Sequence, residues 1–358
     1  MEQNLENAFL TQKILSALPF CVVAFCVSFL VVLLLFLFVK KRTMFAKSLD
    51  KTHLYKIPRF YPTPKIGGLG VILGVGVVFV GAGLYEHFAF YMFGGIIVFL
   101  SGFFRDIGLF LSAKIGVVLQ ALGVFLSLVG LDIWLKYLGL GFELPYSWGI
   151  LFSICVILGV CDCVNVIDKF NGLSGGFVLC VCISAMSVAI SVDMDSVVVI
   201  SATLGSATLG FLILNFPNGK IFLGSGGAYF LGFCIAMILV VLTQTNYSIV
   251  SPWYALCMVM YPVWEVLFLF FKNRVFSTNG LIGIKSEKNQ SYHFHTLLFN
   301  RLGNNPLTSF IILCLQIPFM GLATLFYANT FALMMTCVAF VVLYSVMYHK
   351  LSSSNVRI

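Results

Sequence analysis

Residues 18–39 read LPFCVVAFCVSFLVVLLLFLFV, an apolar run that a Lys-Lys-Arg triplet follows directly. A helix needs about 20 apolar residues to cross the hydrocarbon core of a bilayer, and this run is long enough. We expect an anchor and not a signal peptide, because Glu2 and Glu6 precede the run, the run is too long, and the basic triplet acts as a stop signal. The chain is therefore expected to be an integral membrane protein.

The rest of the chain has the same character, with 60% hydrophobic and 9% charged residues over 358 positions. Such a composition lies well outside that of soluble proteins. Eleven apolar segments are predicted to span the membrane, namely 18–39, 67–84, 89–104, 113–131, 146–163, 173–192, 196–216, 226–245, 250–271, 307–326 and 329–348. The sequence thus predicts an all-α, polytopic membrane helix bundle of about 11 transmembrane helices, forming a single domain over residues 1–358.

The basic residues predict the orientation of this bundle. Assigning the loops alternately to the two sides places 19 of the 21 Lys and Arg residues on one face, with only Lys13 and Lys136 opposite. The positive-inside rule makes that face cytoplasmic, with the N-terminus outside. Two long cytoplasmic loops are expected, at about 40–66 and 272–306. Membrane orientation explains the net charge of +8, so a nucleic-acid partner is not expected.

Polar residues at the ends of membrane spans nominate functional sites, because they are costly in lipid unless they face the bundle interior or water. Lys65 lies in a Pro-Thr-Pro-Lys turn before a glycine-rich span, where an interfacial lysine that snorkels to lipid phosphate is the simpler interpretation. Arg105 and Asp106 end the next span and are followed by Lys114 and Gln120. A structural ion pair and a functional site are both compatible with this pattern, and either one requires Asp106 to face inward.

The most informative stretch is Asn165-Val-Ile-Asp168-Lys169-Phe-Asn171-Gly, which lies between two predicted spans. A turn-forming Asn-Gly explains its end but not the Asn-x-x-Asp that precedes it. An amide, a carboxylate, a lysine and a second amide within seven residues therefore indicate a site at the cytoplasmic surface.

A further group of polar residues joins Asn215, in an Asn-Phe-Pro-Asn-Gly segment, with the His293-Phe-His295 motif of the last long loop. Two histidines at this spacing are able to bind metal or phosphate. No third metal ligand is evident nearby in the sequence, so the identity of any metal ligand stays open.

Taken in order, these motifs resemble those of the polyprenyl-phosphate N-acetylhexosamine-1-phosphate transferases. That family contains the translocase of peptidoglycan synthesis and the initiators of O-antigen and teichoic acid synthesis. The resemblance covers about residues 50–305 and rests on six segments, namely Pro64-Lys-Ile-Gly-Gly68, Arg105-Asp106 with Lys114 and Gln120, Asn165-Val-Ile-Asp168 with Asn171-Gly-Leu, Gly205 to Pro217, Phe222-Leu-Gly-Ser-Gly-Gly, and His293-Phe-His295. Several short motifs in family order on one membrane face make coincidence a poor explanation.

The resemblance implies transfer of a sugar 1-phosphate from a UDP-sugar to polyprenyl phosphate, at the cytoplasmic face of the bacterial inner membrane, in cell-envelope synthesis. It implies Asp106 and Asp168 as catalytic residues. It implies a set of substrate-binding residues consisting of Lys65, Arg105, Lys114, Asn165, Lys169, Asn171, Asn215, His293 and His295. It also implies Mg²⁺, because phosphoryl transfer needs cations that neutralise charge on phosphate oxygens.

The departures from the family pattern are concentrated in this machinery. Arg105 stands where relatives carry an acid, Lys169 where they carry glycine, and Ser225 and Gln290 where they carry aspartate, while Asp162 replaces an asparagine. The site is about four charges more positive than its relatives, which predicts weak Mg²⁺ binding and continued attraction of phosphate.

Three hypotheses of function follow. The first is an active transferase with altered metal dependence. The second is a catalytically inactive homologue that binds lipid phosphate or nucleotide and regulates or scaffolds a partner. The third is a transporter of another class, although transporters place their polar residues near the bilayer midplane and this chain places them at span ends. The sequence does not specify the sugar, the polyprenyl length or the pathway.

Overall fold

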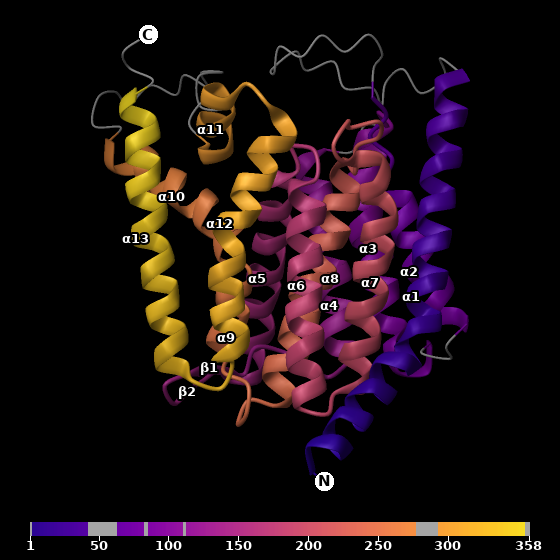
Figure 1. The fold of residues 1–358 in the computed structure, drawn as a ribbon, viewed down its shortest axis with the longest axis vertical. Helices are drawn as coiled ribbons and strands as arrows, with labels where there is room; N and C mark the ends of the chain where they lie inside the picture. Colours follow the sequence, from indigo (N-terminus) through magenta and orange to yellow (C-terminus); the bar gives the residue numbers. More distant parts are fainter. Residues whose placement is uncertain (1, 42–62, 82–84, 110–111, 277–292, 355–358) are drawn as a thin grey trace.

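The computed structural model describes residues 2–41, 63–81, 85–109, 112–276 and 293–354, and nearly all of them are helical (Figure 1). The helices in chain order are α1 Glu2–Lys41, α2 Gly68–Gly81, α3 Tyr85–Asp106, α4 Ala113–Gly130, α5 Tyr146–Ile167, α6 Leu173–Ser191, α7 Asp195–Asn215, α8 Gly224–Thr245, α9 Pro252–Met258, α10 Met260–Phe276, α11 Phe294–Leu302, α12 Asn305–Leu325 and α13 Thr330–Ser354. The predicted all-α class is confirmed.

A small antiparallel hairpin is the exception to this helical architecture. Its strands are β1, Tyr137–Gly139, and β2, Phe142–Glu143, and Tyr137 pairs with Glu143. Sequence analysis did not predict it. Gln244 at the end of α8 binds the hairpin, because its side-chain oxygen accepts hydrogen bonds from the backbone N–H groups of Lys136 and Tyr137 over 3.0 and 2.9 Å.

The described residues contain nine helices long and apolar enough to cross a membrane. Two of the eleven predicted spans differ from a simple crossing helix. The 250–271 segment is broken into α9 and α10, which are bent by 75°. The cause is Pro262, which has no backbone N–H and whose ring would clash with the carbonyl of Met258, where α9 ends. The second predicted span forms only the 14-residue α2.

The outer surfaces of the bundle are apolar. Large hydrophobic side chains are exposed on helices throughout the chain, among them Leu34, Val80, Val118, Phe310 and Leu325. Exposed apolar side chains over so many helices are what lipid contact requires. The chain is therefore a multi-pass membrane protein.

Helix α8 is the most buried helix of the bundle. It packs against α3, α5, α6 and α2, and glycines let its first turn approach the others closely. A Cβ atom on Gly102 of α3 would lie 2.7 Å from the Cα of Gly226, and one on Gly68 of α2 would lie 2.4 Å from the Cα of Gly227. These approaches are possible only without side chains, and they fix the start of α8 between two other helix ends.

The helix ends that carry the predicted site residues meet at one end of the bundle. Helix α1 begins at the opposite end, the end that also carries the hairpin, and α13 ends on the same side as α11 (Figure 1). We call this side the α11 end. Of the long loops predicted at about 40–66 and 272–306, residues 42–62 and 277–292 lie outside the described residues.

Candidate active site

The approach to α2 is held beside the start of α8 by backbone hydrogen bonds. The N–H of Phe222 donates to the carbonyl of Pro64 over 2.9 Å, and the N–H of Gly67 donates back to the carbonyl of Phe222 over 2.8 Å. The Pro-Thr-Pro sequence favours the extended backbone that this pairing needs. This pairing places Lys65, which was predicted to be an interfacial lysine, at the first turn of α8. Its charge acts there on Asp106 at the end of α3 and on Asp168 after α5.

Asp106, the last residue of α3, binds the first turn of α8. Its Oδ2 accepts a hydrogen bond from the N–H of Gly226 over 3.0 Å, and the hydroxyl of Ser225 contacts the same carboxylate. A carboxylate is favourable at a helix N-terminus, where unpaired N–H groups carry partial positive charge. Asp106 therefore points inward, as predicted, and part of its hydrogen-bonding capacity is used to hold α8.

Arg105 turns to a different partner. Its Nη2 donates to the hydroxyl of Tyr229 over 2.9 Å, with the guanidinium 5.6 Å from the centre of that ring. Gln120 of α4 bonds to the same hydroxyl, and Asp162 of α5 is close enough to interact with Arg105 electrostatically. Arg105 is exposed, so its other N–H groups face the surface of the α11 end.

Asp168 directly follows α5 and is half-buried. The hydroxyl of Ser174, at the start of α6, donates to its Oδ1. Burial and the charge of Asp106 raise the pKa of Asp168 to about 7, although the Ser174 hydrogen bond and Lys65 oppose the rise. Lys65, Asp106 and Asp168 thus interact with one another, and we call them the aspartate cluster.

Asn171 and Asn215 hold the turns that surround this cluster. The backbone N–H of Asn171 donates to Asn305 Oδ1 over 2.8 Å, and its side-chain Nδ2 donates to the carbonyl of Pro217 over 2.8 Å. Asn215 Oδ1 accepts from the N–H of Gly172 over 2.7 Å. Both asparagines are buried, so the structure gives them a supporting place, and their contact with substrate stays a prediction.

Three other predicted residues lie outside the aspartate cluster. Asn165 is half-buried in the last turn of α5, and Lys114 is exposed in the first turn of α4. Lys169 is half-buried and faces the charges of Glu265 and His295. Burial lowers the pKa of Lys169, and Glu265 opposes this change. The structure therefore places Lys169 with the histidines and not with its neighbour Asp168.

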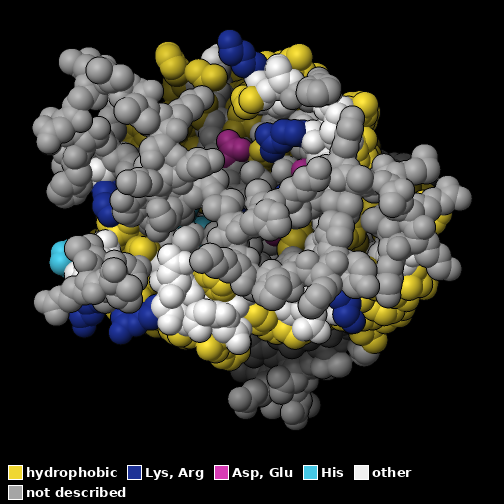
Figure 2. Space-filling view, turned by 90° about the horizontal axis from the view of Figure 1, so that it is seen from above, with side chains coloured by type: hydrophobic (Ala, Val, Ile, Leu, Met, Phe, Trp, Pro, Cys, Tyr) yellow, Lys and Arg dark blue, Asp and Glu magenta, His cyan; other side chains and the backbone are white. Residues whose placement is uncertain are grey.

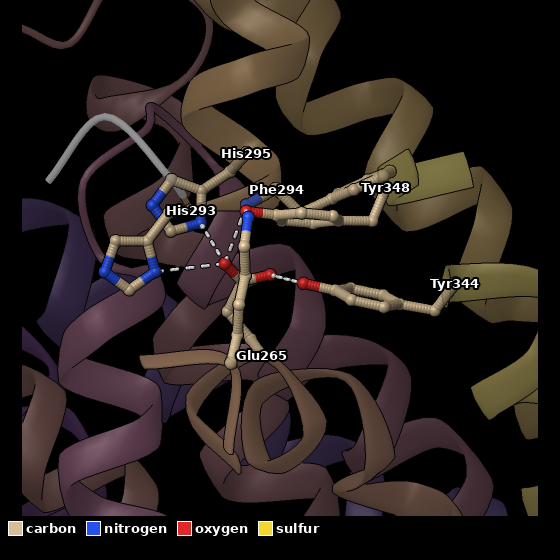
Figure 3. A network of polar contacts seen from close by, with 7 residues as sticks. Glu265, His293, Phe294, His295, Tyr344 and Tyr348 are labelled. Atoms are coloured by element: carbon tan, nitrogen blue, oxygen red, sulfur yellow. Dashed lines mark hydrogen bonds and ion pairs between the residues drawn. The ribbon is translucent and has the colours of Figure 1, made fainter. Parts of the chain in front are cut away.

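The predicted histidines meet an acid that sequence analysis missed. Glu265 of α10 is fully buried, and its Oε1 lies 3.0 Å from His293 Nδ1 and 3.7 Å from His295 Nδ1 (Figure 3). Burial lowers the pKa of His295 to about 3, so its ring is neutral at pH 7. A usable signal existed, because Glu265 is the single acid in the apolar 250–271 segment. We call Glu265, His293 and His295 the histidine cluster.

The aspartate cluster does not supply the ligand set expected for Mg²⁺. Among the residues that the structure describes, the histidine cluster alone brings three metal-ligating side chains within reach of one another. Ser225 brings a hydroxyl and not a carboxylate to Asp106, and Lys65 adds a positive charge. Mg²⁺ prefers carboxylates and phosphates in octahedral geometry. Gln290, the other position at which the resemblance leads us to expect an acid, lies outside the described residues.

The α11 end presents acidic and basic side chains together. Figure 2 views this end and shows Asp or Glu side chains next to Lys or Arg side chains near the middle of the face. The geometry defines a class: a polytopic helical membrane protein whose interacting acids and bases gather at one membrane surface.

Comparison with known proteins identifies the relatives of this class. Residues 88–243 match the sequence model of Glycosyl transferase family 4, a range that runs from α3 to α8 and includes Asp106 and Asp168. The resemblance inferred from the motifs is thereby confirmed.

Individual relatives are similar at modest identity. A probable undecaprenyl-phosphate N-acetylglucosaminyl 1-phosphate transferase of Bacillus subtilis is 28% identical over 240 residues, which cover 64% of this chain and 66% of that protein. The undecaprenyl-phosphate alpha-N-acetylglucosaminyl 1-phosphate transferase of Escherichia coli K12 is 24% identical over 70% and 69% of the two chains. A phospho-N-acetylmuramoyl-pentapeptide-transferase of Heliobacterium modesticaldum is 27% identical over 51% and 62%. The matches thus span about two thirds or less of these relatives.

Proposed function

We propose that the protein transfers an N-acetylhexosamine 1-phosphate from a UDP-sugar to polyprenyl phosphate in cell-envelope synthesis. The observation that carries this proposal is Asp168, a half-buried carboxyl beside Lys65 and Asp106 whose pKa is raised to about 7. A general base works best when its pKa lies near the operating pH. The names of the similar proteins support the reaction class.

In the proposed reaction an oxygen of polyprenyl phosphate attacks the β-phosphorus of the UDP-sugar. The new O–P bond forms as the bond from that phosphorus to the oxygen shared with the α-phosphorus breaks, so UMP leaves and polyprenyl-diphosphate-sugar remains. The second pKa of a phosphate monoester is about 6, so part of the acceptor carries a proton at neutral pH. Asp168 accepts that proton and increases the nucleophilicity of the attacking phosphate.

Asp106 has a narrower role in this proposal than the catalytic one expected from the sequence. It fixes the first turn of α8 through Gly226, and its charge helps to raise the pKa of Asp168. Asp106 is therefore proposed as a positioning residue. Its loss is expected to shift the pH dependence of the rate downward, because Asp168 would then ionise at lower pH.

Lys65 and Arg105 are proposed to neutralise the phosphates. Lys65 lies at the start of α8, where the helix N-terminus also attracts anions. Arg105 donates to Tyr229 with one nitrogen and keeps further N–H groups for a charge-assisted contact with phosphate. These two cations take the part that Mg²⁺ plays elsewhere, so the proposal includes altered metal dependence. Lys114 and Asn165 are proposed as outlying substrate contacts.

The proposed location is the inner membrane of a bacterium, with the α11 end in the cytoplasm and the start of α1 outside. The asymmetry of the basic residues supports this orientation. UDP-sugars are cytoplasmic metabolites, so the same face would meet the donor. The apolar outer surface of the bundle keeps a polyprenyl tail in lipid while its phosphate reaches the aspartate cluster.

A second candidate is a catalytically inactive homologue that binds lipid phosphate or nucleotide. The observation in its favour is Ser225, which brings a hydroxyl to Asp106 at a position where the resemblance leads us to expect an acid. Such a protein would bind lipid phosphate or nucleotide and release no UMP.

One experiment separates the two candidates. Purified protein is mixed with polyprenyl phosphate and a panel of UDP-sugars, and UMP release is measured with Mg²⁺ and with a chelator. The enzyme hypothesis predicts release under both conditions, and a loss of about 10²- to 10⁴-fold for Asp168→Asn. Asp132→Asn is the matched control, because Asp132 is exposed and follows α4 near the hairpin. Ligand binding without any UMP release would establish the inactive homologue.

A further inference from the structure

The histidine cluster joins two helices, α10 and α11, at the α11 end. Glu265 comes from α10, while His293 directly precedes α11 and His295 lies in its first turn. Figure 3 shows both imidazole rings directed at one oxygen of the Glu265 carboxylate. The rings stack with their centres 4.9 Å apart. The arrangement is distinct from the aspartate cluster and plays no part in the proposed reaction.

His295 is the residue of the cluster whose polar atoms lack hydrogen bonds to the described residues. It is fully buried, and neither of its ring nitrogens makes a hydrogen bond to any residue that the structure describes. A buried polar group without a partner destabilises the folded protein, because the group has lost its hydrogen bonds to water. Its Nδ1 lies 3.7 Å from Glu265 Oε1, too far for a hydrogen bond. The His295 ring therefore lies beside the Glu265 carboxylate, but its nitrogens have no hydrogen-bond partner among the described residues.

The spacing suits donor atoms that share a metal ion. Bonds of about 2.0–2.2 Å in a tetrahedral site separate neighbouring donor atoms by about 3.4 Å. The two observed separations from Glu265 Oε1, 3.0 and 3.7 Å, lie on either side of that value. All three donor atoms lie within 4.8 Å of one another. One ion placed between them would give Nδ1 of His295 a partner.

The carboxylate is also held as metal-binding carboxylates are. The backbone N–H of Phe294 donates to Glu265 Oε1 over 2.8 Å, and the hydroxyl of Tyr344 from α13 donates to Oε2 over 2.7 Å. Such outer contacts orient a ligand and typically account for 10- to 100-fold in metal affinity. Phe170 packs edge-on against His295, with ring centres 5.3 Å apart, and helps to keep water from the site.

We propose that Glu265, His293 and His295 bind a divalent transition-metal ion of the Zn²⁺ class, which ties α11 to α10 and α13. Two imidazoles and one carboxylate favour zinc and its neighbours over Mg²⁺, which prefers oxygen ligands. Three protein ligands leave a fourth position for water or a phosphate oxygen. Lys169 is the nearby charge that opposes the ion, so its removal should strengthen binding.

The test uses full-length protein purified in detergent, stripped with a chelator and dialysed against Zn²⁺. Elemental analysis should find about one Zn²⁺ per chain, and less than about a tenth of that in Glu265→Gln and His295→Gln. His349→Gln is the matched control, because His349 is exposed on α13, and it should retain the metal. Lys169→Met should bind Zn²⁺ more tightly than the natural protein.

Two further measurements keep the proposal testable if a ligand variant fails to fold. Tyr344→Phe retains all three ligands and should bind Zn²⁺ about 10- to 100-fold more weakly. Co²⁺ bound in place of Zn²⁺ should give the strong visible absorption of tetrahedral nitrogen and oxygen ligation. The proposal is overturned if the natural protein binds no stoichiometric Zn²⁺, if His295→Gln binds as much as His349→Gln, or if Mg²⁺ competes equally. These readouts do not depend on UMP release, so they are independent of the proposed function.

Discussion

Replacing Asp168 with asparagine should stabilise the protein while it removes activity. Asparagine keeps an oxygen that can accept the hydrogen bond from Ser174 and has nearly the volume of aspartate, but it carries no charge. The pKa of Asp168 is raised from 3.8 to about 7, so the folded protein favours the protonated form. Ionisation of this carboxyl therefore opposes folding at neutral and alkaline pH.

The magnitude follows from the pKa. Well below a pH of 3.8 the carboxyl is protonated in both the folded and the unfolded chain, and it costs nothing. The cost grows as the pH rises from about 4 to 7 and is complete above pH 7. At about 1.4 kcal/mol for each pKa unit, a rise from 3.8 to about 7 corresponds to at most ~4 kcal/mol. Because the side chain is half-buried, solvent screening should reduce this to about 2 kcal/mol.

The assay is thermal unfolding in detergent across the pH range, followed by tryptophan fluorescence. At pH 8.5 the Asp168→Asn protein should unfold a few degrees above the natural protein, and the difference should vanish as the pH falls towards 4. UMP release should fall about 10²- to 10⁴-fold in the same preparation. Asp132→Asn should change neither quantity. If Asp168→Asn unfolds earlier than the natural protein at pH 8.5, Lys65 stabilises the carboxylate more than burial destabilises it, and the argument fails.

Other substitutions test the packing and the charge of the site. Gly102→Ala should destabilise the protein by about 1–3 kcal/mol, because its Cβ would lie 2.5 Å from a backbone nitrogen of α8; the control Gly321→Ala has open space and should unfold at the natural temperature. Asn215→Ala leaves a buried N–H unpaired and should cost about 1–3 kcal/mol in thermal unfolding. Arg105→Glu with Ser225→Asp should raise Mg²⁺ affinity at least about tenfold in calorimetry; an unchanged affinity would show that charge does not limit metal binding.

Hydropathy was sufficient to locate the helices but not to describe their paths. Each of the eleven apolar segments contains helix, because a chain in lipid must satisfy its backbone hydrogen bonds internally. The break between α9 and α10 was missed even though Pro262 lies in the sequence. Length and composition indicate that a segment is apolar, and they do not indicate that its two halves are bent by 75°.

The candidate site was only partly predictable for a related reason. Sequence motifs indicated that Asp106 and Asp168 belong to one site, and the structure brings them together. The partner of Asp106 is a backbone N–H that lies 120 positions away, at Gly226, which no local pattern predicts. Glu265 was missed because it stands alone in an apolar segment, although an isolated acid of that kind is itself a signal. Asn215 was singled out as a substrate-binding residue, and the structure shows that it supports a turn by accepting a hydrogen bond from the N–H of Gly172.

The charges around the first turn of α8 determine which ligands the site is expected to bind. Relatives are expected to place an acid at the position of Ser225, where it would compensate the positive end of the helix and recruit a metal ion. In the part of the chain that the structure describes, Asp106 is the acid that binds that end, while Lys65 adds positive charge beside it. The surplus attracts phosphate oxygens without a metal, because the helix N-terminus, a lysine and an arginine all favour anions. Binding of UDP in the presence of a chelator should therefore weaken steeply with salt, whereas a site completed by Mg²⁺ would lose nearly all its affinity to the chelator alone.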